Sequence, residues 1–159
     1  MNERVEVTLD VNGRLHVVRV EPRRTLADVL RDDCGLGGVH TGCEHGVCGT
    51  CTIVVDGEPV RACLMFAVQA QGSRIMTVEG LADGDKLHPL QRAFIEHHAV
   101  QCGYCTPGFL MLAWSVLSRK PEPSDAELLE LLSSNLCRCT GYRNIVQAVR
   151  IAAAEMRAR

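Results

Sequence analysis

The chain has 159 residues, of which 47% are hydrophobic and 23% are charged, and its formal net charge is −2. This composition is typical of a globular protein with one ordinary domain or two small ones, and it argues against a disordered chain. The charge disfavours nucleic acid or an anionic membrane surface as a partner, and no run of about 18 apolar residues is present to span a membrane.

The N-terminal part is predicted to begin with a β-hairpin followed by a short helix. Two β-rich runs, at 5–11 and 15–20, flank Asn12 and Gly13. This dipeptide is typical of tight hairpin turns because both residues tolerate positive φ. Thr25 then stands where an N-cap is needed, ahead of apolar residues at helical spacing.

A glycine-rich stretch separates this helix from three further predicted strands. Its glycines favour a loop that can wrap a small object closely with bare backbone N–H groups. The strands are expected at 52–55, at 60–63 after the turn Asp56-Gly57, and at 75–78. The six glycines of the stretch are Gly35, Gly37, Gly38, Gly42, Gly46 and Gly49.

The second half of the chain is predicted to be helical. In its first helix we expect Leu90, Phe94 and Ile95 to face inward. Four helices of this length make a small bundle. Helix starts are indicated at His88-Pro89, at Thr106-Pro107, at the capping box of Ser124 with Glu127, and near Asn144.

The chain is therefore predicted to be an α+β protein of two units. The boundary is expected near Leu81 to Leu87, where Asp83-Gly84-Asp85 interrupts the apolar pattern. This places a small β-rich unit with one helix at 1–80 and a helical bundle at 81–159.

Four cysteines follow the spacing of an iron–sulfur protein. Cys43, Cys48 and Cys51 form a C-x4-C-x2-C set, and Cys63 follows after eleven intervening residues. The three-cysteine spacing is that of plant-type ferredoxins, whose 2Fe–2S cluster is held by four thiolates. Without a secretory signal core we expect these cysteines to stay reduced, which favours metal ligation over disulfides. A structural zinc site is the alternative, but zinc ribbons usually offer two C-x2-C knuckles.

Four more cysteines lie at the ends of predicted helices. Cys102 and Cys105 form a C-x2-C set, and Cys137 and Cys139 form a C-x-C set. A bundle can bring two such helix ends together around one site, and thiols near helix N-termini are expected to have a lowered pKa. On spacing alone, zinc and a 2Fe–2S cluster both remain possible for this set.

The other candidate residues point to no separate chemistry. Cys34 has no spacing relation to either set and is interpreted as a small half-buried apolar residue. His97 and His98 are expected within a helix, where neighbouring side chains diverge. His40 and His45 lie in or beside the first cysteine loop, where they could tune a redox potential. No catalytic acid, base or nucleophile is recognisable, so the chain is predicted to carry electrons.

Three motifs together resemble the iron–sulfur subunit of the molybdenum hydroxylases, the family of xanthine dehydrogenase, aldehyde oxidoreductase and aerobic carbon monoxide dehydrogenase. The resemblance covers nearly the whole chain, with 38 residues between Cys63 and Cys102. It favours a 2Fe–2S cluster for the second cysteine set as well. The motifs are Gly42-Cys43-Glu44-His45-Gly46-Val47-Cys48-Gly49-Thr50-Cys51, Gln101-Cys102-Gly103-Tyr104-Cys105-Thr106-Pro107-Gly108 and Asn135-Leu136-Cys137-Arg138-Cys139-Thr140-Gly141-Tyr142.

The resemblance implies a β-grasp, plant-type ferredoxin-like domain followed by a four-helix bundle. It also implies that Gln101 and Cys139 contact a molybdopterin, in the cytosine dinucleotide form, on a large partner subunit. Electrons would pass from that centre through the bundle cluster and the ferredoxin-like cluster to FAD on a medium subunit. The chain would thus be a non-catalytic subunit of a cytoplasmic hetero-oligomer, for which a dimer of heterotrimers is one arrangement. In that assembly we expect the segment from Leu81 to Leu87 to be packed.

Two other functions compete with this one. A zinc-stabilised adaptor without redox activity would be colourless, whereas an iron–sulfur protein is red-brown. A free-standing ferredoxin would shuttle between enzymes, but it leaves the bundle cluster and Gln101 without an evident role.

Overall fold

The sheet begins with the hairpin that the sequence predicts. Strands β1 (Val5–Val11) and β2 (Arg14–Val20) pair antiparallel, and the turn residues Asn12 and Gly13 have φ of 54° and 77°. Buried and less buried side chains alternate along β1, so one face of the hairpin supplies core residues. Helix α1 (Leu26–Asp32) follows, and the side chain of Thr25 accepts a hydrogen bond from the backbone N–H of Asp28 at 3.1 Å.

Three short strands complete a five-stranded mixed sheet of order β2-β1-β5-β3-β4. They are β3 (Thr52–Val55), β4 (Glu58–Arg61) and β5 (Arg74–Met76), and β5 pairs parallel with β1. The returning strand ends earlier than predicted, because Cys63 lies in the 3₁₀ turn Ala62–Leu64. The N–H of Ala62 still donates to the carbonyl of Cys51 at 3.2 Å, which keeps this turn beside the start of β3.

The second half consists of the four predicted helices. Helix α4 begins with the predicted capping box. Two details of the prediction are wrong. Ile95 is 61% exposed because Ala93 and Phe94 take the inward positions of the first helix. His97 and His98 follow that helix rather than lie within it, since it ends at Glu96. The helices are α2 (Pro89–Glu96), α3 (Thr106–Arg119), α4 (Asp125–Leu132) and α5 (Arg143–Arg157).

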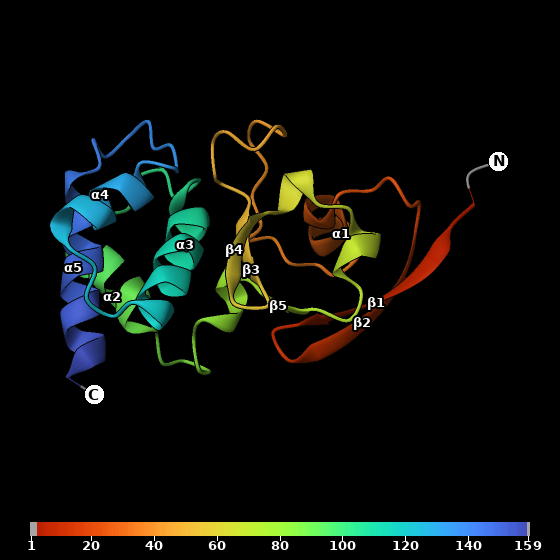
Figure 1. Cartoon of the computed structure of the whole chain (residues 1–159), viewed down its shortest axis with the longest axis horizontal. Helices are drawn as coiled ribbons and strands as arrows, with labels where there is room; N and C mark the ends of the chain where they lie inside the picture. Colours follow the sequence, from red (N-terminus) through yellow and green to blue (C-terminus); the bar gives the residue numbers. More distant parts are fainter. Residues whose placement is uncertain (1–2, 159) are drawn as a thin grey trace.

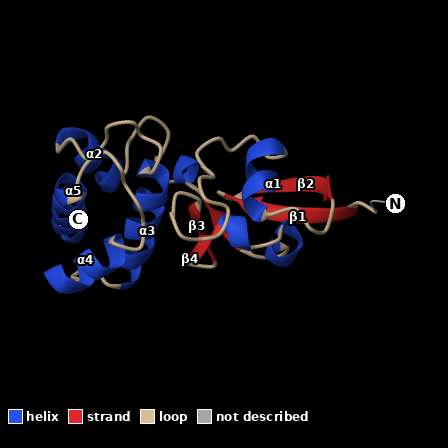
Figure 2. Cartoon of the chain, turned by 90° about the horizontal axis from the view of Figure 1, so that it is seen from above, coloured by secondary structure: helices blue, strands red, loops and turns tan. Residues whose placement is uncertain are grey.

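The computed structural model describes residues 3–158, and in it the sheet half and the helical half lie side by side (Figure 1). The predicted α+β class is confirmed. Figure 2 shows helices α2 to α5 gathered at one end, and the hairpin of β1 and β2 with helix α1 at the other. No helix within the described residues is both long and apolar enough to cross a membrane.

Helix α3 joins the two halves. It packs on β3, and Val54 of that strand belongs to the same apolar core as Phe109 and Leu110 of the helix. The hydroxyl of Ser115 donates to the carbonyl of Gly57 at 3.0 Å. In the connecting segment 81–87, Leu81 is the buried residue and most of the rest is exposed in this chain. The sheet–helix contact, rather than the connecting segment, therefore fixes how the halves meet.

Candidate metal centres

The first four predicted ligands are brought together by a loop and a strand pair. Positive φ at Glu44, Gly46 and Gly49 curls the loop that carries Cys43 and Cys48. Cys51 immediately precedes β3, and Cys63 lies just after β4. Because Thr52 pairs with Arg61 across these strands, the chain segments of Cys51 and Cys63 lie side by side.

The environments of these thiols differ strongly. The N–H of Cys48 donates to Sγ of Cys43 at 3.3 Å, and this bond, with the N–H groups of His45 and Val47, lowers the pKa of Cys43 to about 6. Cys51 is 2% exposed, and burial raises the pKa of its thiol to about 11. The thiol of Cys51 interacts with those of Cys63 and Cys48, and the thiol of Cys43 interacts with that of Cys48, so the four sulfurs belong to one site.

The second set of cysteines also converges. Cys102 and Cys105 precede α3, whereas Cys137 and Cys139 lie between α4 and α5. Sγ of Cys139 is 3.5 Å from Sγ of Cys102, and the thiol of Cys105 interacts with those of Cys137 and Cys102. All four line one cavity of about 600 Å³. The two helix ends therefore meet as the sequence predicts.

The thiols of this second site differ in pKa because their hydrogen bonds and burial differ. Burial alone would raise the pKa of Cys137, but the hydroxyl of Thr140 at 3.1 Å and its N–H at 3.4 Å from Sγ outweigh burial and lower the pKa. The N–H of Cys137 in turn donates to the hydroxyl of Tyr142 at 3.0 Å. For Cys105 the expectation of a lowered pKa is wrong, because burial at the start of α3 raises the pKa to about 12.

The donor chemistry of both sites fits a binuclear iron–sulfur cluster. Each site offers four cysteine sulfurs, and Cys43 and Cys137 already accept hydrogen bonds from backbone N–H groups. Within the described residues, no group of three or more His, Cys, Asp or Glu side chains is arranged to hold a single metal ion.

The two sites are connected directly. The N–H of Leu136, the neighbour of Cys137, donates to the carbonyl of Cys48 at 2.9 Å. Cys48 and Thr50 also line the cavity of the second set. A connection between the ligand sets therefore runs through one hydrogen bond between two loops and a few covalent bonds.

The two sites are held together by a close approach between backbone segments. A Cβ added to Gly108, in the first turn of α3, would lie 2.4 Å from the carbonyl oxygen of Gly49 and 3.0 Å from Cα of Thr50. Gly49 in turn faces Asn135, which is 1% exposed. The side-chain amide of Asn135 has no hydrogen-bond partner among the described residues. Only glycine fits at both contact points.

The remaining candidates from the sequence lie around the two sites or in the sheet half. Gln101 is exposed next to Cys102 in the chain, and Cys139 is exposed as well. Nδ1 of His45 is within hydrogen-bonding distance of the Cys43 carbonyl. Cys34 packs against the core of the sheet half, and burial raises the pKa of its thiol.

Several residues that build the junction were quoted in the motifs but given no role from the sequence. They interact through the backbone or across long sequence separations, so spacing along the chain carries little signal for them. The exception is glycine, whose place between ligands or at a helix start is a visible cue to close approach. They are Thr50, Tyr104, Gly108, Asn135 and Leu136.

Comparison with known proteins agrees with these two sites. Residues 9–77 match the family model described as a 2Fe-2S iron-sulfur cluster binding domain, and residues 77–150 match the model of a 2Fe-2S binding domain. The chain is 57% identical over 148 residues to the nicotine 6-hydroxylase small subunit of Paenarthrobacter nicotinovorans, covering 93% of this chain and 89% of that protein.

Solved structures share the whole fold. Quinoline 2-oxidoreductase from Pseudomonas putida 86 has a chain that matches with a TM-score of 0.93 at 50% identity, over 98% of both chains. The aldehyde oxidoreductase from Desulfovibrio desulfuricans matches with a TM-score of 0.92 at 43% identity, over 96% of this chain but 17% of that one. The same fold thus occurs both as a separate chain and as a small part of a much longer one.

Proposed function

The chain belongs to the family of 2Fe–2S small subunits of the molybdenum hydroxylases, which are electron-transfer subunits of multi-subunit oxidoreductases, and from this premise we propose its ligands and electron route. One 2Fe–2S cluster is held by the first cysteine set and the second by the helical set. Electrons enter at the helical site from the molybdopterin centre of a large subunit and leave at the ferredoxin-like site. The first set is Cys43, Cys48, Cys51 and Cys63, and the second is Cys102, Cys105, Cys137 and Cys139.

The clusters supply one-electron redox chemistry, and the residues of this chain determine where it takes place. Hydrogen bonds to sulfur stabilise the more negative state of a cluster and so raise its reduction potential. The donors found here are the N–H of Cys48 toward Cys43 and both donors of Thr140 toward Cys137.

One observation carries the proposed route: the hydrogen bond from the N–H of Leu136 to the carbonyl of Cys48. It joins a neighbour of one ligand set to a member of the other. A relay needs a short, fixed separation between its two sites, and a carrier whose sites worked independently would have no use for such a bond.

The exposure of the two sites supports an order of partners. Cys102 and Cys139 are exposed, so the helical site opens outward, and with Gln101 they form the face that we propose for the large molybdopterin-binding subunit. The molybdopterin is proposed to be the cytosine dinucleotide form. Around the ferredoxin-like loop, Val47 and Leu64 are 58% and 63% exposed, which suits a second protein surface.

We propose that this second surface receives a medium subunit that binds FAD. The assembly is then a hetero-oligomer, with a dimer of heterotrimers as its simplest closed form. A cytoplasmic location follows from the need to keep eight ligand thiols reduced until iron is inserted. The division into a ferredoxin-like unit, 1–80, and a helical unit, 81–159, likewise stands as a proposal.

Single cysteine substitutions test the ligand assignment. In the full chain with its clusters assembled, Cys105→Ser is expected to lower bound iron from about four to about two per chain and to remove one of two S = 1/2 EPR signals. Cys51→Ser should remove the other signal, while Cys34→Ser should keep both signals and all the iron. Loss of both signals from either ligand variant, with the fold retained by circular dichroism, would contradict two separate sites.

A further inference from the structure

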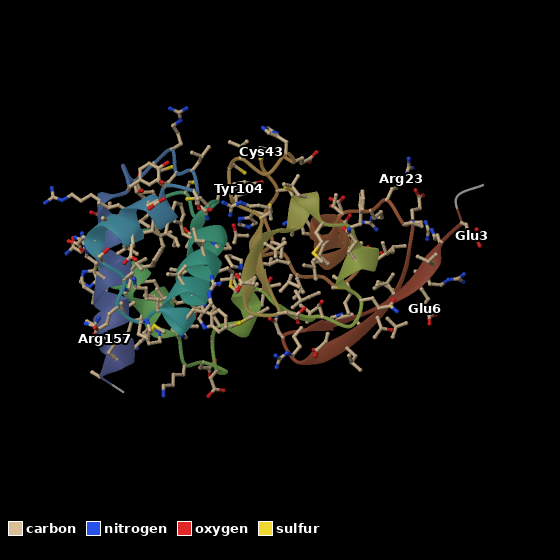
Figure 3. All side chains as sticks on the ribbon, viewed as in Figure 1. Glu3, Glu6, Arg23, Cys43, Tyr104 and Arg157 are labelled. Carbon is tan, nitrogen blue, oxygen red and sulfur yellow. The ribbon has the colours of Figure 1, made fainter. Side chains whose placement is uncertain are left out.

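Tyr104 occupies an unusual place between the two sites. It stands between the ligands Cys102 and Cys105 in the helical half, yet its contacts are with the loop of the other half. Figure 3 shows Tyr104 and Cys43 near one another on the upper side of the molecule, where the two halves meet. Tyr104 is 51% exposed and lines the cavity that holds the second cysteine set.

The backbone carbonyl of Tyr104 accepts two hydrogen bonds from distant residues. The hydroxyl of Thr50 donates to it at 2.9 Å, across a separation of 54 residues. Nδ1 of His40 lies 2.7 Å from the same oxygen, across 64 residues, and must donate because a carbonyl can only accept. Both lone pairs of this carbonyl are therefore committed to the first cysteine loop.

The side chain of Tyr104 makes two more contacts with that loop. Its ring stacks on the ring of His40, with centroids 4.7 Å apart and planes inclined by 17°. Its hydroxyl donates to the carbonyl of Thr41 at 2.6 Å. A half-exposed tyrosine remains soluble without such contacts. The backbone carbonyl and the side-chain hydroxyl of Tyr104 are nevertheless both bonded to the segment 40–50.

These contacts restrain the loop before α3, which the packing of α3 does not restrain directly. Helix α3 holds the halves together through β3 and through the close approach of Gly108 to Gly49. Cys105 is the N-cap of α3 and accepts a hydrogen bond from the N–H of Phe109, whereas Cys102 lies in the loop before the helix. Tyr104 ties this loop itself to the segment that carries Cys43 and Cys48.

We propose that Tyr104, held by Thr50 and His40, is a positioning residue that fixes the distance and orientation between the two cluster sites. The rate of electron tunnelling falls steeply with distance. A small displacement of the loop that carries Cys102 and Cys105 would therefore give a wider range of transfer rates between the two clusters. The inference rests on the proposed function, because it needs a cluster at each site.

The test compares hydroxyl-removing substitutions in one loop. Thr50→Val removes a donor to Tyr104, and Thr41→Val is the matched control because Thr41 meets Tyr104 through its backbone carbonyl, which the substitution keeps. His40→Leu removes the second donor and the stack, and His40→Asn restores a nitrogen donor near the position of Nδ1. Tyr104→Phe removes the contact to Thr41 and retains the ring and the carbonyl.

The readout is the spin–spin interaction between the two reduced clusters in low-temperature EPR of the full chain, with iron content and midpoint potentials measured on the same samples. We expect iron at the wild-type level in all variants. The interaction should be weakened and broadened in Thr50→Val and His40→Leu, most strongly when the two are combined, and less in Tyr104→Phe. Thr41→Val should match the wild type, and His40→Asn should recover part of the loss.

Two results would overturn the proposal. An unchanged interaction in the combined Thr50→Val and His40→Leu variant would show that packing alone sets the spacing. Loss of iron from the helical site in that variant would show that these contacts assemble the site rather than space it. Fewer than two cluster signals in the wild type would instead overturn the proposed function, so the two failures are distinguishable.

Discussion

The two cysteine sites differ in how far the residues of this chain bury their cysteines. At the ferredoxin-like site, Cys51 and Cys63 are 2% and 8% exposed and belong to the core of the sheet half. At the helical site, Cys102 and Cys139 are exposed and line an open cavity of about 600 Å³. The first site is built largely by the sheet half of this chain, whereas the second is open in this chain, on the face proposed for the large subunit.

This difference explains how one small chain can take electrons from one partner and pass them to another. An exposed site can approach a donor centre closely, and a more enclosed site keeps its geometry when partners change. The hydrogen bond from Leu136 to Cys48 joins the two without a mobile connection between them.

The largest effect is expected in the loss of iron to a chelator. Because the helical site is open, its cluster should be lost from the isolated chain well before the ferredoxin-like cluster, and its EPR signal should decay first. Binding of the large subunit should remove most of this difference. Equal decay of both signals in the isolated chain would contradict the contrast in exposure.

Gly108→Ala should damage the junction between the sites. The added Cβ would lie 2.4 Å from the backbone oxygen of Gly49, and overpacking of this kind costs about 1–3 kcal/mol. The gain in helix propensity is at most about 1 kcal/mol, so a net loss of stability is expected in urea unfolding.

The control is Gly37→Ala, in the glycine-rich stretch that also contains Gly49. Its Cβ would meet nothing within 4 Å, and its backbone φ is not in the positive range. It should unfold like the wild type and keep the interaction between the clusters. If Gly108→Ala were as stable as Gly37→Ala, the contact between Gly108 and the carbonyl oxygen of Gly49 would have room for a Cβ atom, which contradicts this prediction.

Ser124→Ala should weaken the bundle without affecting the junction. The Ser124 hydroxyl caps α4 by accepting from the N–H of Glu127, and loss of an N-cap typically costs about 1 kcal/mol. Thermal unfolding should show the loss, while both cluster signals and their interaction remain unchanged. An altered interaction would mean that the bundle transmits distant changes to the sites.

The smallest effect concerns pH and Glu127. Hydrogen bonds from Lys120 and from the N–H and hydroxyl of Ser124 lower the pKa of Glu127 from its ordinary 4.5 to about 2. A lowered pKa in the folded state means that the carboxylate stabilises the fold fully above pH 4.5 and that this contribution is lost as pH falls through about 2.

We expect the free energy of unfolding of the cluster-free chain to differ between wild type and Glu127→Gln near pH 7. The two values should become similar as the pH approaches 2. A difference that stays constant across this range would assign the effect to the shape of the side chain rather than to its charge.

Most of the architecture was predictable because its signals are local. The Asn12-Gly13 turn, the Thr25 cap and the Ser124 capping box each specify their geometry within a few residues, and all three are confirmed. Errors arose where tertiary context decides. Ile95 is exposed because its neighbour Phe94 takes the core position, and the strand before Cys63 ends in a 3₁₀ turn that returns to Cys51.

The junction could not be predicted in the same way. Its bonds join Leu136 to Cys48 and Thr50 to Tyr104 across more than 50 residues, and both use a backbone carbonyl that any residue possesses. Cysteine spacing therefore points to two sites, but only the folded chain indicates that they are connected.

In the proposed function this chain holds two 2Fe–2S clusters close enough to act as a relay. The most direct test is low-temperature EPR of the dithionite-reduced chain, with iron and zinc quantified in the same sample. We predict two S = 1/2 signals that broaden one another, with about four irons per chain. A single signal with two irons, or zinc without an EPR signal, would contradict it.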